Sequence, residues 1–212
     1  MKKITAFIGI GIGLVLAFFI PASFAADTPE GYYRYIIQEG DNLHKIAPEK
    51  SWDTIMRVNH IDAQHLQVGR EILIPINHEN IPAFCPVPQE IDSDVKKLPR
   101  VIYVFLEAQY FGAYEFGQLK FWGPLSSGKK NHATPTGKFK IMQKAKNYFS
   151  HNKAYYGTPM PYALRITNDG IFLHQQALPG KPASHGCIRL LMSDAKKLFY
   201  WVSIDDQVVI LP

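Results

Sequence analysis

The chain has 212 residues, of which 47% are hydrophobic and 19% are charged, so a disordered tail and a highly charged coil are both excluded. Two cysteines are too few for a scaffold built on disulfides. The formal net charge is +5, and it falls to +3 without the first 25 residues, which is too weak a surplus to argue for nucleic acid as a partner.

The first 25 residues have the pattern of a secretory signal peptide. Lys2 and Lys3 form a positive start, residues 4–20 are apolar and uncharged, and small residues precede a cut after Ala25. An uncleaved membrane anchor is the alternative, because 17 apolar residues lie at the short edge of what spans a bilayer. Either form exports the rest of the chain to the periplasm or the cell wall. Export argues against nucleic acid and nucleotide cofactors, and we expect no cofactor.

Residues 33–76 are predicted to form a small βααβ module. Asp41 and Asn42 offer side-chain oxygens that cap the first of its two helices. In chain order, the predicted elements are a strand over 33–37, a helix over 43–47, a helix over 51–59 and a strand over 71–75. So small a core needs all of its apolar positions.

This module resembles the LysM domain in two runs, Tyr35–Leu43 and Val68–Pro75, and in the single residue Asn59. The family binds glycans that contain N-acetylglucosamine, such as the backbone of peptidoglycan, and the resemblance implies the same target here. Among the matching residues, Gly40, Asp41 and Asn59 are expected to serve the fold rather than the ligand.

Residues 77–97 are predicted to be a linker, because prolines interrupt any periodicity and the stretch is polar. Cys85 lies in it. An even number of cysteines in an exported chain leaves a Cys85–Cys187 disulfide open as an alternative to a free thiol at Cys187.

Residues 98–212 are predicted to form a second, mostly β domain. Turn residues separate its predicted strands, which cover 100–106, 115–121, 137–142, 162–166, 170–173 and 207–211. Ser193 is predicted to cap a helix between the last two. Strands this closely spaced favour antiparallel pairing into a sandwich or barrel-like core over a Rossmann sheet. Four aromatic residues are expected in that core rather than in a lid: Tyr148, Phe149, Tyr155 and Tyr156.

A cysteine with two histidines stands out in this domain, and it has three interpretations. In the first, an imidazole takes the proton of Cys187 and makes it a nucleophile, with His174 at a strand end and His185 two residues before the sulfur. In the second, the three side chains bind zinc, although no familiar ligand spacing supports it. In the third, the cysteine is simply buried in a tight turn.

The run Ser184–Leu190, together with the upstream His174, resembles the active-site signature of the L,D-transpeptidase (YkuD) family. The segment Thr134–Phe139 resembles the family's Thr-Pro-x-Gly-x-Phe segment. The resemblance covers roughly residues 98 to 211. It implies a β-sandwich-like catalytic domain of the L,D-transpeptidase type, which agrees with the strands predicted above and would follow the LysM module in the chain.

Carried over by position, the resemblance makes Cys187 the acylated nucleophile and His174 the general base, oriented by the backbone carbonyl of Gln175. His185 matches a second histidine of the pocket. The backbone of Gly186 and Cys187 matches the oxyanion site, and Ser184 belongs to the same group of oxyanion and substrate contacts. Arg189 matches a residue that serves the structure or binds a substrate carboxylate.

One departure from the family concerns the stretch between the base and the signature. Only nine residues separate His174 from Ser184, whereas many relatives have a longer stretch that begins with His-Gly. Here Gln175 and Gln176 follow the base, and a loop over 179–182 follows them. The departure affects the shape of the donor pocket rather than the chemistry.

The implied function is peptidoglycan L,D-transpeptidation. The Cys187 thiolate attacks the third-residue carbonyl of a tetrapeptide stem, D-alanine leaves, and an amine accepts the acyl group from the thioester. The acceptor is a second stem, a wall-anchored lipoprotein or a free amino acid. Water as acceptor makes the enzyme an L,D-carboxypeptidase instead, and a non-catalytic wall-binding protein is the remaining alternative. A LysM module tethered by a short linker would raise the local concentration of this insoluble substrate.

Overall fold

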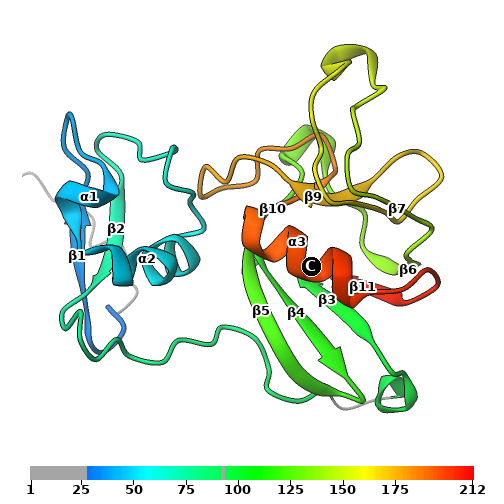
Figure 1. Ribbon diagram of the computed structural model, residues 1–212, viewed down its shortest axis with the longest axis horizontal. Coiled ribbons are helices and arrows are strands. Elements are labelled where there is room, and N and C mark those ends of the chain that lie inside the picture. Colours follow the sequence, from blue (N-terminus) through cyan, green and yellow to red (C-terminus); the bar gives the residue numbers. More distant parts are fainter. Residues whose placement is uncertain (1–27, 92–93) are drawn as a thin grey trace, which may run out of the picture.

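The computed structural model describes residues 28–91 and 94–212 of the chain (Figure 1). The predicted signal peptide, residues 1–25, lies outside the described residues. In the described ranges, we find no helix whose length and apolar character would let it cross a membrane.

The N-terminal module has the predicted βααβ order. Its elements are β1 (Tyr32–Ile36), α1 (Leu43–Ile46), a 3-10 turn over Glu49–Ser51, α2 (Trp52–Asn59) and β2 (Glu71–Pro75). β1 and β2 pair antiparallel, and a small apolar core lies under them, formed by Ile37, Leu43, Ala47, Ile55, Ile61, Ile72 and Ile74. The predicted cap is also confirmed, because the Asn42 side chain accepts a hydrogen bond from the Lys45 N–H at 3.1 Å.

Asn59 and Asp41 serve the fold of this module, as predicted. The Asn59 amide donates to the carbonyls of Ile55 and Leu73, both at 2.8 Å, and it accepts the Leu73 N–H at 2.7 Å. It therefore joins α2 to β2. The Asp41 carboxylate accepts the Gln38 N–H at 2.7 Å and closes the turn after β1.

The second domain is a curled, mixed sheet with one long helix against it. Within the described residues the sheet has nine strands, in the order β6-β11-β3-β4-β5-β10-β9-β8-β7. They are β3 (Val101–Phe105), β4 (Tyr110–Glu115), β5 (Gln118–Ser126), β6 (Gly137–Lys140), β7 (Gln143–Ala145), β8 (Ala163–Arg165), β9 (Phe172–Gln175), β10 (Ile188–Leu190) and β11 (Gln207–Leu211), and the helix is α3 (Met192–Trp201). Short 3-10 turns cover Asp94–Lys97, Lys130–His132 and Lys153–Tyr155.

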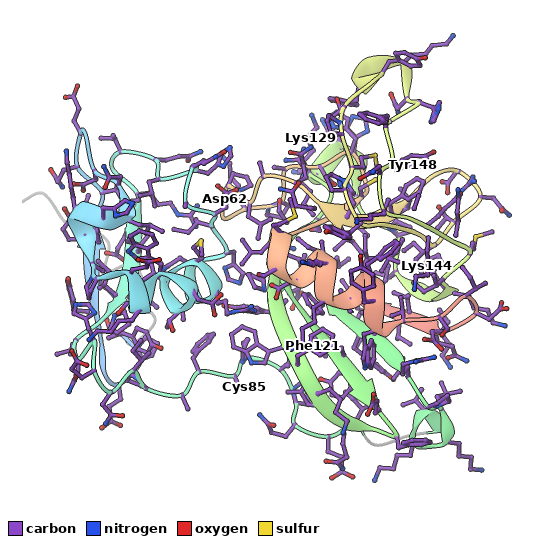
Figure 2. The ribbon with its side chains drawn as sticks, viewed as in Figure 1. Asp62, Cys85, Phe121, Lys129, Lys144 and Tyr148 are labelled. Atoms are coloured by element: carbon purple, nitrogen blue, oxygen red, sulfur yellow. The ribbon has the colours of Figure 1, made fainter. Side chains whose placement is uncertain are left out.

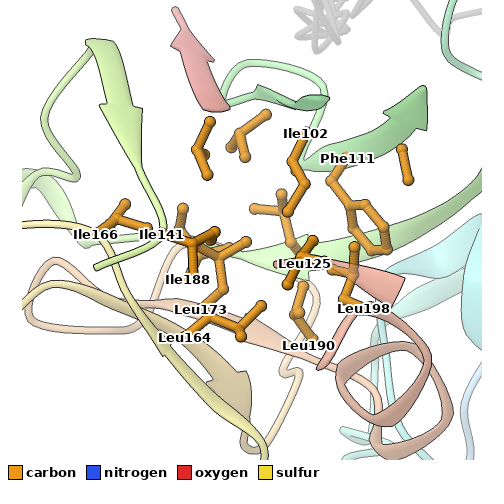
Figure 3. Close-up of a cluster of buried hydrophobic side chains, with 14 of the residues drawn as sticks. Ile102, Phe111, Leu125, Ile141, Leu164, Ile166, Leu173, Ile188, Leu190 and Leu198 are labelled. Atoms are coloured by element: carbon orange, nitrogen blue, oxygen red, sulfur yellow. The ribbon is translucent and has the colours of Figure 1, made fainter. Parts of the chain in front are cut away.

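The curl of the sheet encloses the main apolar core of the domain. Side chains from β3 and β4 face side chains from β9 and β10, and α3 contributes Leu198 (Figure 3). Large, fully buried members include Ile102, Phe111, Leu125, Ile141, Leu164, Leu173, Ile188 and Leu190. The predicted mostly β, sandwich-like class is therefore confirmed.

The predicted antiparallel pairing is wrong at two places, where β3 pairs with β11 and β9 pairs with β10 in parallel. Parallel neighbours need a crossover connection of about a dozen residues. Residues 176–187 supply that connection between β9 and β10. Since such a connection has no periodicity of its own, strand spacing alone did not reveal it.

The single strand predicted over 115–121 is wrong, because a hairpin turn interrupts it. β4 ends at Glu115 and β5 begins at Gln118, and both residues between them have positive φ, 47° at Phe116 and 82° at Gly117. Two such residues make the primed turn that fits the twist of a hairpin. An aromatic residue rarely takes this conformation, so Phe116 concealed the turn.

The predicted cap at Ser193 is also wrong, because α3 begins one residue before it, at Met192, and its N-cap makes no side-chain hydrogen bond. The acidic side chain of the first turn, Asp194, points instead to the N-terminal module. It is only 2% exposed, and its Oδ1 lies 2.8 Å from the guanidinium of Arg57 on α2. Arg57 also donates to the carbonyl of Trp122 on β5 at 2.9 Å. The LysM-like module is thus docked on the second domain as well as linked to it.

We predict that Asp194→Ala lowers the free energy of unfolding by about 2 kcal/mol, because it removes the buried partner of a partly buried guanidinium and leaves Arg57 paired, among the described residues, only with the exposed Asp53. Urea denaturation followed by circular dichroism measures the change. The matched control is Lys50→Ala, which removes an ion pair of the same module with Glu79 that is largely exposed, and which should cost under about 1 kcal/mol. Equal effects of the two substitutions would contradict the importance of the docked contact.

Candidate active site

The pairing of β9 with β10 puts the candidate catalytic side chains on one face of the sheet. His174 lies directly opposite Arg189, and Leu173 lies opposite Ile188. Successive side chains of a strand point to opposite faces, and Leu173 and Ile188 point into the core. His174 and Arg189 therefore point away from the core, and Cys187, two residues before Arg189, starts on their side.

A pocket of about 420 Å³ lies on this face, and it gathers most of the predicted site. Five of the predicted residues line it: His174, Ser184, His185, Cys187 and Arg189. The predicted Gln175 lines a different cleft with its side chain, although its carbonyl contacts the base, and Gly186 belongs to the turn beneath the pocket. Sequence reasoning missed Arg165 and Asp169, which also line the pocket and had no motif to mark them.

His174 is held as a neutral base. Its Nδ1 lies 2.8 Å from the Gln175 carbonyl, which can only accept, so Nδ1 carries the hydrogen and Nε2 keeps its lone pair. The side chain is 4% exposed. Burial lowers the pKa of His174 from 6.5 to about 4, against the hydrogen bond to Gln175, and the positive charge of Arg189 acts in the same direction as burial.

Cys187 is a neutral thiol in this environment. Burial raises its pKa, an effect that Asp169 reinforces and that the Phe172 backbone hydrogen bond and the charge of Arg189 oppose. The sulfur lies 3.8 Å from the Gly170 carbonyl, and Cys187 and Cys85 are both free, so the alternative disulfide is not formed in this structure. Both members of the pair are therefore uncharged near neutral pH.

A serine and a threonine fix the turn that carries the nucleophile. Ser184 Oγ accepts the Gly186 N–H at 3.0 Å and donates to the Cys187 carbonyl. Thr134 Oγ1 donates to the Gly186 carbonyl at 2.8 Å. Gly186 has φ +112°, and a Cβ there would lie 2.7 Å from Ile171 Cδ1, so only glycine fits. The Gly186 amide predicted for the oxyanion is engaged by Ser184 in this conformation.

The segment between β7 and β8, residues 146–162, projects away from the sheet (Figure 1). Several of its residues line the pocket, and we refer to the segment as the lid. Tyr155 Oη lies 2.6 Å from His185 Nε2, which joins the lid to the nucleophile's turn. Tyr148 lines the pocket and packs on Phe172 with ring centroids 4.8 Å apart. Tyr156 is 78% exposed. The prediction that these aromatic residues belong to the core holds for Tyr148, which packs against a buried cluster that includes Phe172. It is wrong for Phe149, Tyr155 and Tyr156, which are exposed because their segment leaves the sheet.

The second interpretation of the motif required His174, His185 and Cys187 to act together as metal ligands. Across residues 28–91 and 94–212, no three histidine, cysteine or acidic side chains gather closely enough to hold a metal ion. An imidazole and a thiol in one pocket are the combination that nucleophilic catalysis requires.

Comparison with known proteins gives two family matches. The model of the L,D-transpeptidase catalytic domain (YkuD) matches residues 99–210, and the model of the LysM domain matches residues 35–75. The first match covers more than half of the chain.

Individual relatives agree with these matches. The probable L,D-transpeptidase 3 of Mycobacterium tuberculosis is 30% identical over 101 residues, which are 41% of this chain and 37% of that relative. The chain thus spans little more than a third of the curated relative that it matches. An L,D-transpeptidase structure from Stackebrandtia nassauensis is 30% identical with a TM-score of 0.50, covering 55% of this chain and 57% of that one. One from Mycobacterium tuberculosis H37Rv is 20% identical and shares the fold over 85% and 90% of the two chains, with a TM-score of 0.50.

We predict that Cys187 reacts slowly with iodoacetamide at neutral pH, because only the thiolate reacts and burial raises the pKa of this thiol. In a Cys85→Ser background, the alkylation rate measured by mass spectrometry should reach its midpoint at a higher pH in the folded protein than in the same protein unfolded in urea. If the alkylation midpoint lies at a lower pH in the folded protein than in the unfolded protein, Cys187 is a thiolate at rest. That result would contradict a neutral Cys187 and His174.

Proposed function

The chain belongs to the L,D-transpeptidase family, and on that premise we propose that it is an exported peptidoglycan L,D-transpeptidase with Cys187 as its nucleophile. The two matched domains both point to peptidoglycan as the polymer that it binds. One observation carries the proposal. Cys187 shares its pocket with an imidazole whose Nδ1 is held by a carbonyl, so that Nε2 is left to accept a proton.

The first half of the reaction joins the stem peptide to the enzyme. The proton of the Cys187 thiol moves to Nε2 of His174 while the sulfur bonds to the carbonyl carbon of the third stem residue. Burial disfavours both the free thiolate and the imidazolium, so proton transfer accompanies the attack rather than preceding it. The carbonyl oxygen becomes an oxyanion, for which we assign the backbone N–H of Cys187.

The leaving group departs with the same proton. Collapse of the tetrahedral intermediate breaks the bond to the nitrogen of the terminal D-alanine, and the imidazolium of His174 protonates that nitrogen. An imidazolium with a pKa of about 4 gives up its proton readily, which suits an amine leaving group. The products are free D-alanine and a thioester at Cys187.

Arg189 is proposed to bind a carboxylate of the stem. Its guanidinium lines the pocket, and no Asp or Glu of the described residues is an ion-pair partner for it. An arginine fork fits a carboxylate with two parallel hydrogen bonds. The stem of a peptidoglycan tetrapeptide carries carboxylates, so this cation would orient it beside the sulfur.

In the second half, an amine attacks the thioester and regenerates the thiol. The neutral His174 takes a proton from the amine and returns it to the departing sulfur. A diamino acid of a second stem gives a 3-3 cross-link, and a lysine of a wall-anchored lipoprotein gives protein attachment. Water in the same position gives an L,D-carboxypeptidase.

We predict that Cys187→Ala lowers the release of D-alanine from a tetrapeptide at least about a thousandfold, because no other group in the pocket can form the thioester. Mass spectrometry of muropeptides after incubation with the protein measures both this release and the identity of the acceptor. The control, Cys85→Ala, changes an exposed thiol of the linker and should keep full activity. Turnover retained by Cys187→Ala would overturn the proposal, and wall binding without turnover in the wild type would favour the non-catalytic alternative.

We predict that kcat/KM keeps its value as the pH falls to about 5 and declines with a midpoint near pH 4. His174 must be neutral to accept the proton, and its pKa is lowered from 6.5 to about 4, so its protonation begins only in that range. Circular dichroism at each pH controls for acid unfolding. A midpoint near 6.5 would contradict a buried base.

A further inference from the structure

A second cleft, of about 630 Å³, lies between the two modules. The N-terminal module lines it with Met56 and residues 62–65, and the catalytic domain lines it with residues 175–177 and 191–193. Asp62, at the edge of the N-terminal module that faces the catalytic domain, marks its position in Figure 2. Nothing in the proposed chemistry at Cys187 uses this cleft.

The cleft neighbours the active-site pocket, because Gln176 lines both. Gln176 Nε2 also donates to the Pro159 carbonyl of the lid at 3.3 Å. Its neighbour Gln175 lines the cleft and holds His174 through its carbonyl. The two glutamines that depart from the family pattern after the base therefore form the boundary between the two sites.

Contacts between the modules fix both walls of the cleft. Asp62 accepts the Leu178 N–H at 2.7 Å, and its own N–H donates to the Leu178 carbonyl at 3.2 Å. Arg70 donates to the carbonyls of Pro179 and Gly180. Together with the ion pair of Arg57 and Asp194, these bonds hold the modules on two sides of the cleft. It is a preformed site rather than a gap between loosely linked domains.

The chemistry of the two sites differs. The Cys187 pocket contains Arg165 and Arg189 against one acid, Asp169, which suits the anionic stem peptide. The cleft has one carboxylate, Asp62, whose oxygens are engaged by Leu178 and by the His65 ring at 2.7 Å.

The rest of the cleft lining is uncharged. The amide and hydroxyl groups come from Gln64, Gln175, Gln176 and Ser193, and the apolar side chains from Met56, Leu191 and Met192. A neutral N-acetylated sugar presents the matching surface of hydroxyls, an amide and apolar ring faces.

We propose that this interdomain cleft binds the N-acetylated sugar from which the reacting stem peptide extends. The inference rests on the proposed function, because it assumes that the third stem residue lies at Cys187. Three extended residues reach about 10 Å, which is the span that this placement requires between Cys187 and a sugar beyond Gln176. Each module then supplies one wall of a single substrate site.

The test compares two substrates, a disaccharide-tetrapeptide and the free tetrapeptide. Gln64→Ala combined with Ser193→Ala removes one polar group from each wall, and both side chains are exposed, so the fold is kept. The loss of two hydrogen bonds should raise KM for the disaccharide-tetrapeptide about tenfold and leave kcat unchanged. Both constants for the free tetrapeptide should stay at their wild-type values. Lys50→Ala is the control on the same module, and a second variant, Ala63→Trp, fills the cleft and should give the same split.

Each outcome decides the proposal. An equal rise in KM for both substrates would show that the cleft acts only through residues 175–176 beside the active site. An unchanged KM for both substrates would place the sugar elsewhere. Either result overturns the proposal. If the wild type releases no D-alanine from either substrate, the proposed function fails, and calorimetric binding of the disaccharide-tetrapeptide then tests the cleft by itself. Loss of that binding in the double variant, with the free tetrapeptide unaffected, supports the cleft.

Discussion

The active site depends on the parallel pairing of β9 with β10. Because Leu173 and Ile188 point into the core, the alternation of side chains along each strand places His174 and Arg189 on the other face. Cys187, two residues before Arg189, lies on that face too. A shift of one residue in this register would reverse every one of these side chains. The sheet thus fixes the base and the nucleophile relative to each other before any substrate binds, and the lid adds only the enclosure above them.

The docked LysM module changes how the two domains are expected to cooperate. A tethered module would raise the local concentration of the wall without fixing its orientation. The ion pair of Arg57 with Asp194, and the bonds of Asp62 and Arg70 to residues 178–180, instead hold glycan-binding and catalytic surfaces in one arrangement. A buried ion pair contributes little net stability once desolvation is counted, but it penalises every other arrangement of its partners. Its role here is to set the position of one module on the other.

The sequence predicts best what is decided locally. The strands Glu71–Pro75 and Gln207–Leu211 match residue for residue, because alternation and flanking turns define them. The gathering of the signature residues in one pocket followed from a resemblance that names them, and their roles remain proposals. The parallel registers and the contact of Arg57 with a residue 137 positions away were not predictable, since no local pattern encodes such a partner. The protonation state of Cys187 and His174 was not predictable either. The sequence suggested that the imidazole ionises the thiol, whereas burial keeps both groups neutral at rest.

A neutral resting pair has a consequence for the proposed exported enzyme. Oxidation of a thiol proceeds through its thiolate, so a raised pKa protects Cys187 between turnovers. The same burial makes charge separation depend on the substrate, whose carbonyl takes up the negative charge as the sulfur attacks. In the proposed second half of the reaction, the thioester reacts with whichever acceptor, an amine or water, passes the lid. Because Tyr155 reaches His185 across the pocket, the lid and the nucleophile's turn together determine how far water reaches the thioester. In the proposed mechanism, the balance between transpeptidation and hydrolysis would therefore depend on the lid rather than on the Cys187–His174 pair.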